Sequence, residues 1–118
     1  MPNALFIGWG AGVRGREGKA LEVFGEALAY FAQLQQQGEI ESFETFALEQ
    51  HGGDLAGFLI AKGDPEKLAR LRTSDEFQRL NARAGFIVEN FGVVRAWTGA
   101  EMQQLFGMFG SMVAEFGG

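Results

Sequence analysis

The residues best suited to acid–base chemistry in this sequence are His51 and Glu44. Imidazole is the side chain that titrates near neutrality without help, and His51 is the one histidine of the chain, three residues before Asp54. Glu44 interrupts a largely apolar segment, so it needs a partner or a ligand if it is buried. We therefore predict that His51 and Glu44 are the catalytic residues of any reaction. The competing interpretations are a solvated turn histidine and a glutamate on an exposed strand edge.

Residues 10–15 (GAGVRG) have the glycine spacing of a dinucleotide-binding loop. They follow an apolar segment and precede a helical pattern, which is the required context. The chain has 18 glycines in 118 residues, so this spacing arises easily by chance. The next two strands form a hairpin, whereas a dinucleotide fold needs parallel crossovers. Nucleotide binding by Gly10–Gly15 is therefore the least favoured functional interpretation.

Arg14 and Arg16 give the same loop a second interpretation. They lie just before a helix N-terminus, whose dipole and free N–H groups attract anions. A small carboxylate or phosphate group would fit such a place. The alternative is a flexible connection with two solvated arginines.

Two tryptophans and a further arginine suggest a small-molecule pocket. Trp9 ends the first apolar segment, and Arg95 and Trp97 share one face of the last one because they lie two residues apart. If these three and Glu44 converge, they form an aromatic pocket with a charged anchor. The alternative for Arg95 is an ion pair across a subunit interface. The predicted ligand-binding residues are thus Trp9, Arg14, Arg16, Arg95 and Trp97.

Composition restricts cofactors and partners. The chain has no cysteine and one histidine, and no loop has calcium-type spacing, so we expect no metal and no cofactor. Its 15 acidic and 10 basic residues give a net charge of -5, which argues against nucleic acid or an anionic membrane as partner. The sequence has no leader-like or membrane-spanning apolar run, so we expect a cytoplasmic location.

Four strands must position these residues. Apolar and alternating patterns predict them at Ala4–Gly8, Ile40–Leu48, Leu55–Ala61 and Val93–Trp97. A tight turn at residues 51–54 (HGGD) joins the middle two, because Gly52 and Gly53 supply the positive φ angles that such a turn needs.

Helical patterns lie between and after the strands. An apolar stripe from Leu21 to Leu34 predicts the first helix, which Gly38 ends. Asp64-Pro65 starts the second, and a capping box at residues 73–76 (TSDE) breaks it in two. A further capping box at residues 98–101 (TGAE) starts a last helix with a wide apolar stripe, which we expect to fold back over the sheet or onto a partner subunit.

This order of elements predicts an α+β fold: a ferredoxin-like βαββαβ sandwich with an extra C-terminal helix. We expect one domain, with residues 1–97 as the core and residues 98–118 as the added helix. Helices in this fold cover one face of the sheet. The other face should carry large apolar residues, since Phe6, Phe43, Phe46, Phe58 and Val94 must divide between the two sides. An exposed apolar patch of that size usually has a partner, and the simplest is a second copy of the chain.

The element order, the broken second helix at residues 72–77 (RTSDEF) and the hairpin turn resemble the dimeric α+β barrel superfamily. That group includes stress-responsive proteins and the antibiotic-biosynthesis and heme-degrading monooxygenases. The resemblance extends from Ala4 to about Trp97, and it implies the sandwich fold and a homodimer formed through the sheets. No catalytic motif of those families matches this chain residue by residue.

The sequence therefore supports two functional hypotheses. In the first, a homodimer binds or acts on a small, mostly apolar molecule, which can be anionic, in a cleft between sheet and helices. In the second, the protein is a non-enzymatic dimerisation or regulatory module, and side chains fill that cleft.

Overall fold

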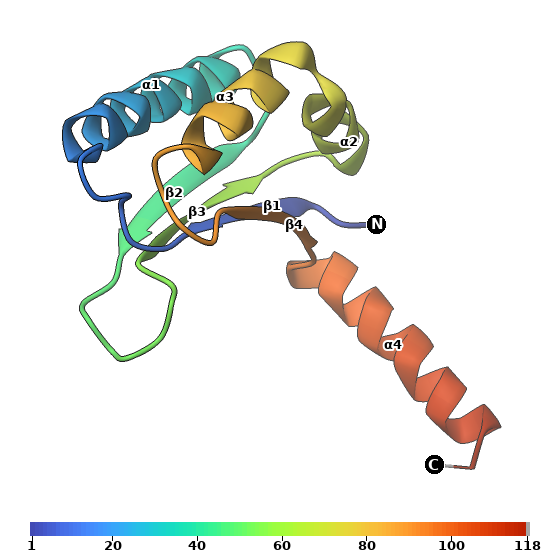
Figure 1. The fold of residues 1–118 in the computed structure, drawn as a ribbon. Coiled ribbons are helices and arrows are strands. Elements are labelled where there is room, and N and C mark those ends of the chain that lie inside the picture. The colour runs from blue at the N-terminus through green and yellow to red at the C-terminus, as the bar shows by residue number, and fades with distance from the viewer. Residues whose placement is uncertain (118) are drawn as a thin grey trace.

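The computed structural model describes residues 1–117, which form one four-stranded sheet and four helices (Figure 1). The elements follow the order β1 (Ala4–Trp9), α1 (Glu17–Gln36), β2 (Ser42–Ala47), β3 (Gly57–Lys62), α2 (Pro65–Thr73), α3 (Asp75–Gly85), β4 (Gly92–Ala96) and α4 (Gly99–Glu115).

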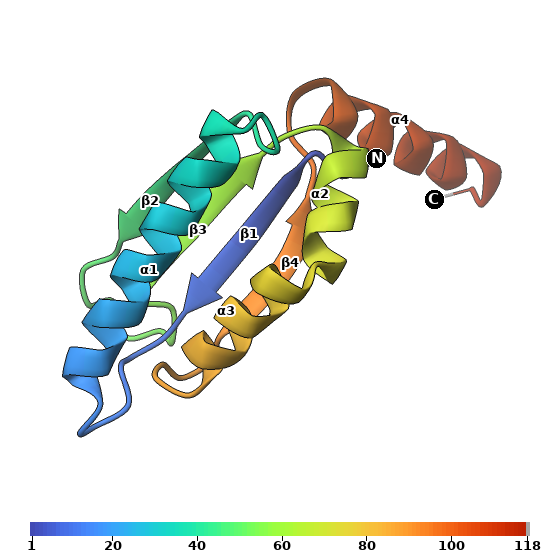
Figure 2. The same ribbon diagram turned by 90° about the horizontal axis from the view of Figure 1, so that it is seen from above.

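All strand pairs are antiparallel, and the strand order is β2-β3-β1-β4. This order places two split βαβ units side by side. Seen from above, α1 lies over β2 and β3, whereas α2 and α3 lie over β4 (Figure 2). The predicted ferredoxin-like βαββαβ sandwich is confirmed.

The middle strands are shorter than predicted. Ile40 is buried, but it belongs to the turn that ends α1, where its amide N–H donates to the carbonyl oxygen of Leu34 at 3.4 Å. At the other end, the chain leaves the sheet after Ala47, and the hairpin loop runs to Ala56. Apolar character alone could not distinguish a strand residue from a buried turn residue here.

Capping side chains set the starts of α2 and α3, as the sequence indicates, whereas α1 and α4 begin without a side-chain cap. The carboxylate of Asp64 accepts a hydrogen bond from the Lys67 amide at 3.1 Å, and Pro65 occupies the first helical position. The predicted break between α2 and α3 is confirmed, with Ser74 as the cap: its hydroxyl accepts a hydrogen bond from the Phe77 amide at 3.3 Å. Gly38 follows α1 with a φ of 77°, the left-handed stop that was expected.

The core lies between the sheet and the helices α1, α2 and α3. Side chains alternate along a strand, and Leu5 and Ile7 of β1 and Leu59 of β3 point toward the helices, where each is at most 6% exposed. Phe31 of α1 and Phe77 of α3 meet there edge to face, with ring centroids 6.4 Å apart. This aromatic contact joins the two helices above the sheet.

The opposite face of the sheet carries a row of stacked aromatic rings. Phe58 of β3 stacks on Phe6 at a centroid distance of 5.2 Å and on Phe46 at 4.8 Å. Phe46 is 39% exposed and Val94 of β4 is 55% exposed. We call Phe6, Phe46, Phe58 and Val94 the aromatic sheet face. None of the helices in residues 1–117 lies over it (Figure 1), so the expected apolar bare face is present.

The helix α4 extends away from the sandwich and has no buried residue (Figure 1). The expectation that it folds back over the sheet of its own chain is therefore wrong. Gly99 has a φ of 60° and turns the chain outward, and α1, α2 and α3 already cover the helical side of the sheet. No helix in the described part of the chain combines the length and apolar character of a membrane span.

Phe77 provides a direct test of the packing. Its side chain is 1% exposed, so replacement by alanine should leave a cavity and lower the free energy of unfolding by about 3–5 kcal/mol. The matched control is Phe86→Ala, because Phe86 is 69% exposed and should tolerate the change within about 0.5 kcal/mol. Urea denaturation followed by circular dichroism measures both. Equal losses for the two variants would contradict the described core.

Candidate functional site

A cavity of about 540 Å³ opens between the sheet and the helices α1 and α3. Ile7, Trp9 and Leu59 form its floor on the sheet. Val23, Phe24 and Ala27 of α1 line one wall, and Leu80, Asn81 and Ala84 of α3 line the other. The cavity thus lies in the cleft that the sequence predicts.

Small side chains create this space. Ala20 and Ala27 on α1 and Ala84 on α3 line the cavity, with Gly10 and Gly12 at its edge. Elsewhere between the same layers, the core is filled by large side chains from every helix of the sandwich, such as Leu34, Leu68, Leu71 and Phe77. The helices are therefore held off the sheet by bulky residues, while alanine and glycine leave the region around Trp9 open.

The cavity wall is apolar except for a few groups. Among its side chains, Glu17 in the first turn of α1 carries a carboxylate, Asn81 carries an amide, and Trp9 carries an indole N–H. No lysine or arginine lines it. Such a wall suits an apolar molecule with one or two hydrogen-bonding groups.

Trp9 is held in place from two sides. Its ring packs edge-on against Phe24 with centroids 5.7 Å apart. It also lies over Gly57, its partner in the β1–β3 ladder: a Cβ on Gly57 would be 2.7 Å from the indole and 2.7 Å from the carbonyl oxygen of Phe46. Glycine at position 57 therefore allows the indole to lie flat on the strand. The prediction that Trp9 binds a ligand stays a prediction, but the residue is in the right place for it.

The glycine loop does not have the geometry of a nucleotide site. The amide N–H groups of Gly10 and Val13 donate to the carbonyl oxygens of Glu89 and Ile87 at 2.7 and 2.9 Å. Gly12 forms a β-bridge with Val88, and α1 begins only at Glu17. Because these N–H groups are taken and the sheet is antiparallel throughout, neither a phosphate cradle nor a dinucleotide fold is formed.

Arg14 and Arg16 lie outside the cavity wall. Arg16 donates from Nη1 to the carbonyl oxygen of Phe86 at 2.7 Å, just after α3 ends. It thus ties the loop to the end of that helix. Arg14 is exposed. Anion binding by either residue stays a prediction.

His51 has a structural role in the hairpin loop. Its Nδ1 accepts a hydrogen bond from the Gly53 amide at 3.2 Å, and its Nε2 lies 2.9 Å from the carbonyl oxygen of Leu55. These two contacts fit the neutral tautomer with the proton on Nε2. The lone pair that a general base needs is then already engaged. The predicted catalytic role is not tested by this geometry, yet the ring is exposed and outside the cavity wall.

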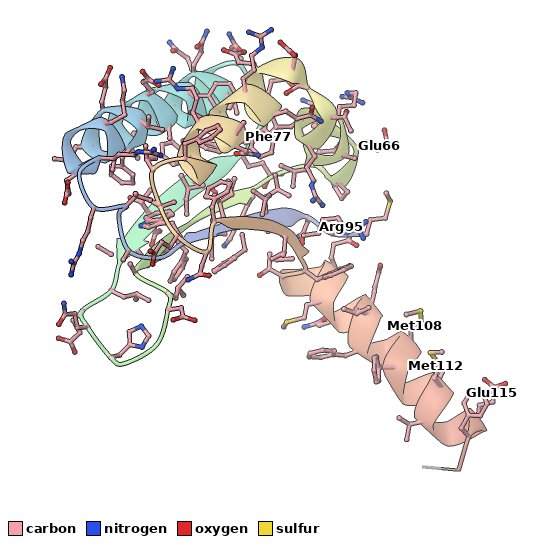
Figure 3. All side chains as sticks on the ribbon, viewed as in Figure 1. Glu66, Phe77, Arg95, Met108, Met112 and Glu115 are labelled. Atoms are coloured by element: carbon pink, nitrogen blue, oxygen red, sulfur yellow. The ribbon has the colours of Figure 1, made fainter. Side chains whose placement is uncertain are left out.

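The expected convergence of Glu44, Arg95, Trp97 and Trp9 does not occur. Glu44 is opposite Ile60, which is opposite Phe6, so it shares the aromatic sheet face. Arg95 is opposite Leu5 and belongs to the helical face, beside Arg72 of α2 and near the start of α4 (Figure 3).

Register explains the separation. Trp9 pairs with Gly57 at the last position of β1, whereas Arg95 pairs with Leu5 near the start of that strand. Trp97 follows β4 directly and therefore lies at the end of the sheet remote from Trp9. The residue spacing within a single strand does not predict which residues of the neighbouring strand lie opposite Trp9 or Arg95.

Sequence reasoning missed the small residues that make the cavity. Ala20, Ala27 and Ala84 lie at inward positions of helices whose other inward positions hold valine, leucine and phenylalanine. A run of alanines in an apolar stripe was the available signal. Across residues 1–117, no group of three or more histidine, cysteine or acidic side chains is arranged to hold a metal ion.

Similar solved structures support the architecture. Two are dimeric ferredoxin-like proteins of unknown function. The one from Bacteroides fragilis has 12% sequence identity and a TM-score of 0.57, and the match covers 80% of this chain and 95% of that chain. The one from Jannaschia sp. CCS1 has 17% identity and a TM-score of 0.57, and the match covers 79% of this chain and 94% of that chain. The third is SnoaB, a cofactor-independent oxygenase from Streptomyces nogalater (16% identity, TM-score 0.52, covering 85% and 98%).

The fold is ferredoxin-like. At these identities the similarity establishes the ferredoxin-like fold and nothing finer. No family model and no curated protein sequence matches the chain significantly. The neighbours are covered almost completely, whereas 15–21% of this chain has no counterpart in them. That remainder is close in size to the segment after Trp97.

The variant Gly57→Ala tests whether the indole of Trp9 packs on Gly57. The added methyl group meets the indole and a carbonyl oxygen that is fixed in the sheet, so the tryptophan must move. Stability should fall by about 1–3 kcal/mol, and the emission of Trp9 should shift in a variant that lacks Trp97. Gly25→Ala is the control, because no atom lies within 4 Å of the new methyl and alanine favours a helix. Unchanged stability and emission in Gly57→Ala would show that the indole does not lie on this glycine.

Proposed function

We propose that this protein is a homodimer that binds a small, mostly apolar molecule in the cavity beside Trp9. The observation that carries the proposal is the cavity itself. Its volume of about 540 Å³ falls within the range of about 300–1,000 Å³ that is usual for ligand sites. A dimerisation module without a ligand would have this space filled by side chains.

The wall suggests the chemistry of the ligand. Trp9, Phe24 and Phe31 offer aromatic surface for a flat ring system. The Glu17 carboxylate can accept a hydrogen bond, and the Asn81 amide and the indole N–H can donate one. With Glu17 as the charged group of the wall, a neutral aromatic molecule is favoured over the anion that the arginines suggested.

Oxygenation of the bound molecule is a second candidate function. The observation that favours it is the similarity to SnoaB, which is a cofactor-independent oxygenase. Glu17 is then the carboxylate placed to take a proton from a hydroxyl group of the ligand. Oxygen consumption that depends on both the ligand and the Glu17 carboxylate, and disappears in Glu17→Gln, would support this candidate.

The homodimer follows from the aromatic sheet face. Phe46 remains 39% exposed in a single copy, and Phe58 and Phe6, which stack beside it, are only partly buried. Such an apolar surface usually has a partner. A second copy presents an identical surface about a two-fold axis. Two of the similar structures are described as dimeric.

Ligand binding can be followed by tryptophan fluorescence, because Trp9 lines the cavity and Trp97 does not. In the variant Trp97→Phe, the neutral probe 1,4-naphthoquinone should quench Trp9 saturably. Its sulfonate, 1,4-naphthoquinone-2-sulfonate, should bind more weakly because it adds an anion beside Glu17. In Trp9→Phe, the remaining Trp97 should show only linear, collisional quenching.

Two alanine-to-leucine variants of α1, one inside the cavity and one outside it, test whether the probe binds in the cavity. In the Trp97→Phe background, Ala27→Leu places three extra carbons in the cavity and should weaken the probe at least about tenfold. Ala29→Leu, at an exposed position of the same helix, should leave the affinity unchanged. Linear quenching of Trp9 by the quinone, with no thermal stabilisation at saturating concentration, would contradict ligand binding in the cavity.

The dimer has its own test. Phe58→Glu places a charge in the centre of the aromatic sheet face and should convert the dimer to a monomer in light scattering coupled to size exclusion. Phe86→Glu, the same change at an exposed residue after α3, should remain dimeric. A dimer that survives Phe58→Glu with unchanged dissociation would place the interface elsewhere.

A further inference from the structure

The helix α4 has a continuous apolar face, and nothing in residues 1–117 of its own chain covers it. At 100° per residue, the side chains of one broad arc are nearly all apolar, and the other side carries Gln103, Gln104, Met108, Ser111, Glu115 and small residues. Phe106 and Phe109 are each 63% exposed. We define the apolar face of α4 by its large residues, which are Met102, Leu105, Phe106, Phe109, Met112, Val113 and Phe116.

Without a partner, α4 would not be a stable helix. At 17 residues, α4 is only slightly longer than the about 12–15 residues below which an isolated helix is marginal in water even with good helix formers. Gly107 and Gly110 lie in its interior, where glycine weakens a helix more than any residue except proline. Thr98 precedes it without a capping hydrogen bond from its side chain. Packing of the apolar face is therefore what would hold this segment helical.

The direction of α4 is fixed by contacts at its start. The side chain of Asn3 makes two hydrogen bonds with the backbone of Thr98: Nδ2 donates to the carbonyl oxygen at 3.1 Å, and Oδ1 accepts from the amide at 3.0 Å. The Met1 amino group also pairs with Glu101. From there α4 runs on the side of the sheet opposite to α1, α2 and α3, which is the side of the aromatic sheet face (Figures 1 and 3).

We infer that α4 is an arm that packs its apolar face on the second copy of the chain, the copy that also covers the aromatic sheet face. This inference rests on the proposed homodimer. A partner placed against the sheet enters the angle between the sheet and α4, so one molecule covers both surfaces. Because such a pair has two-fold symmetry, α4 of each chain packs on the other chain.

Charge and comparison favour a second copy as the occupant. The residues of α4 include Glu101 and no lysine or arginine, so the helix lacks the cations that nucleic acid or an anionic bilayer rewards. Two of the similar structures are described as dimeric, and they match 80% and 79% of this chain. In the proposed homodimer, the arm would add contact area to the pair that the sheets form.

The experiment compares two double variants of the full chain by sedimentation velocity over a concentration series. Phe106→Glu with Phe109→Glu puts two charges on the apolar face of α4. Gln103→Glu with Gln104→Glu puts the same two charges on its polar side. We expect the first to raise the dimer dissociation constant by at least about tenfold and the second to leave it unchanged. Because α4 has no buried residue within its own chain, both variants should leave the sandwich folded.

The possible outcomes separate the inference from the homodimer proposal. A wild-type chain that sediments as a monomer overturns both. A wild-type dimer whose dissociation is equally unaffected by both double variants overturns the arm and leaves the homodimer. A tetramer that the apolar-face variant reduces to a dimer also overturns it, because α4 would then lie between pairs.

Hydrogen exchange of the wild-type protein gives an independent reading, even if a variant misfolds. Amides of residues 102–115 should be protected above the dimer dissociation constant and exchange rapidly below it. Protection that does not change with protein concentration would overturn the inference.

Discussion

The structure depends on one constraint: its sheet has two apolar faces, and the chain supplies helices for only one of them. Alternation along β1 and β3 sends Leu5, Ile7 and Leu59 into the core and Phe6 and Phe58 to the other side. Both sets are large and apolar, so neither face is suited to water. The aromatic row and α4 both present this excess of apolar surface, and in the proposed homodimer a second copy of the chain would cover both.

The sandwich itself was predictable because its signals are local. The caps Asp64 and Ser74, the stop at Gly38 and the apolar stripe of α1 are each contained within a few residues. The site was harder because it depends on register. Whether Arg95 meets Trp9 is decided by the ladder that pairs Arg95 with Leu5, and no pattern within β4 carries that information.

The cavity illustrates a different limit of sequence reasoning. Large apolar residues in a sequence indicate a core. A cavity instead arises where side chains are small, here at Ala20, Ala27 and Ala84. Alanine in a helix has an equally good explanation in helix propensity. The three-dimensional structure is needed to see that the three alanines line the same cavity as Trp9 and Leu59, and so leave space for a ligand. The fate of α4 was also undetermined, because an apolar stripe predicts burial and does not name the surface that covers it.

The most direct test is the mass of the wild-type protein in solution, measured by sedimentation equilibrium at micromolar concentration. If a second copy covers the aromatic sheet face, the particle has twice the chain mass of 12.9 kDa. A particle of 12.9 kDa with the sandwich intact would mean that water tolerates the stacked phenylalanines, and the account of the interface would be wrong.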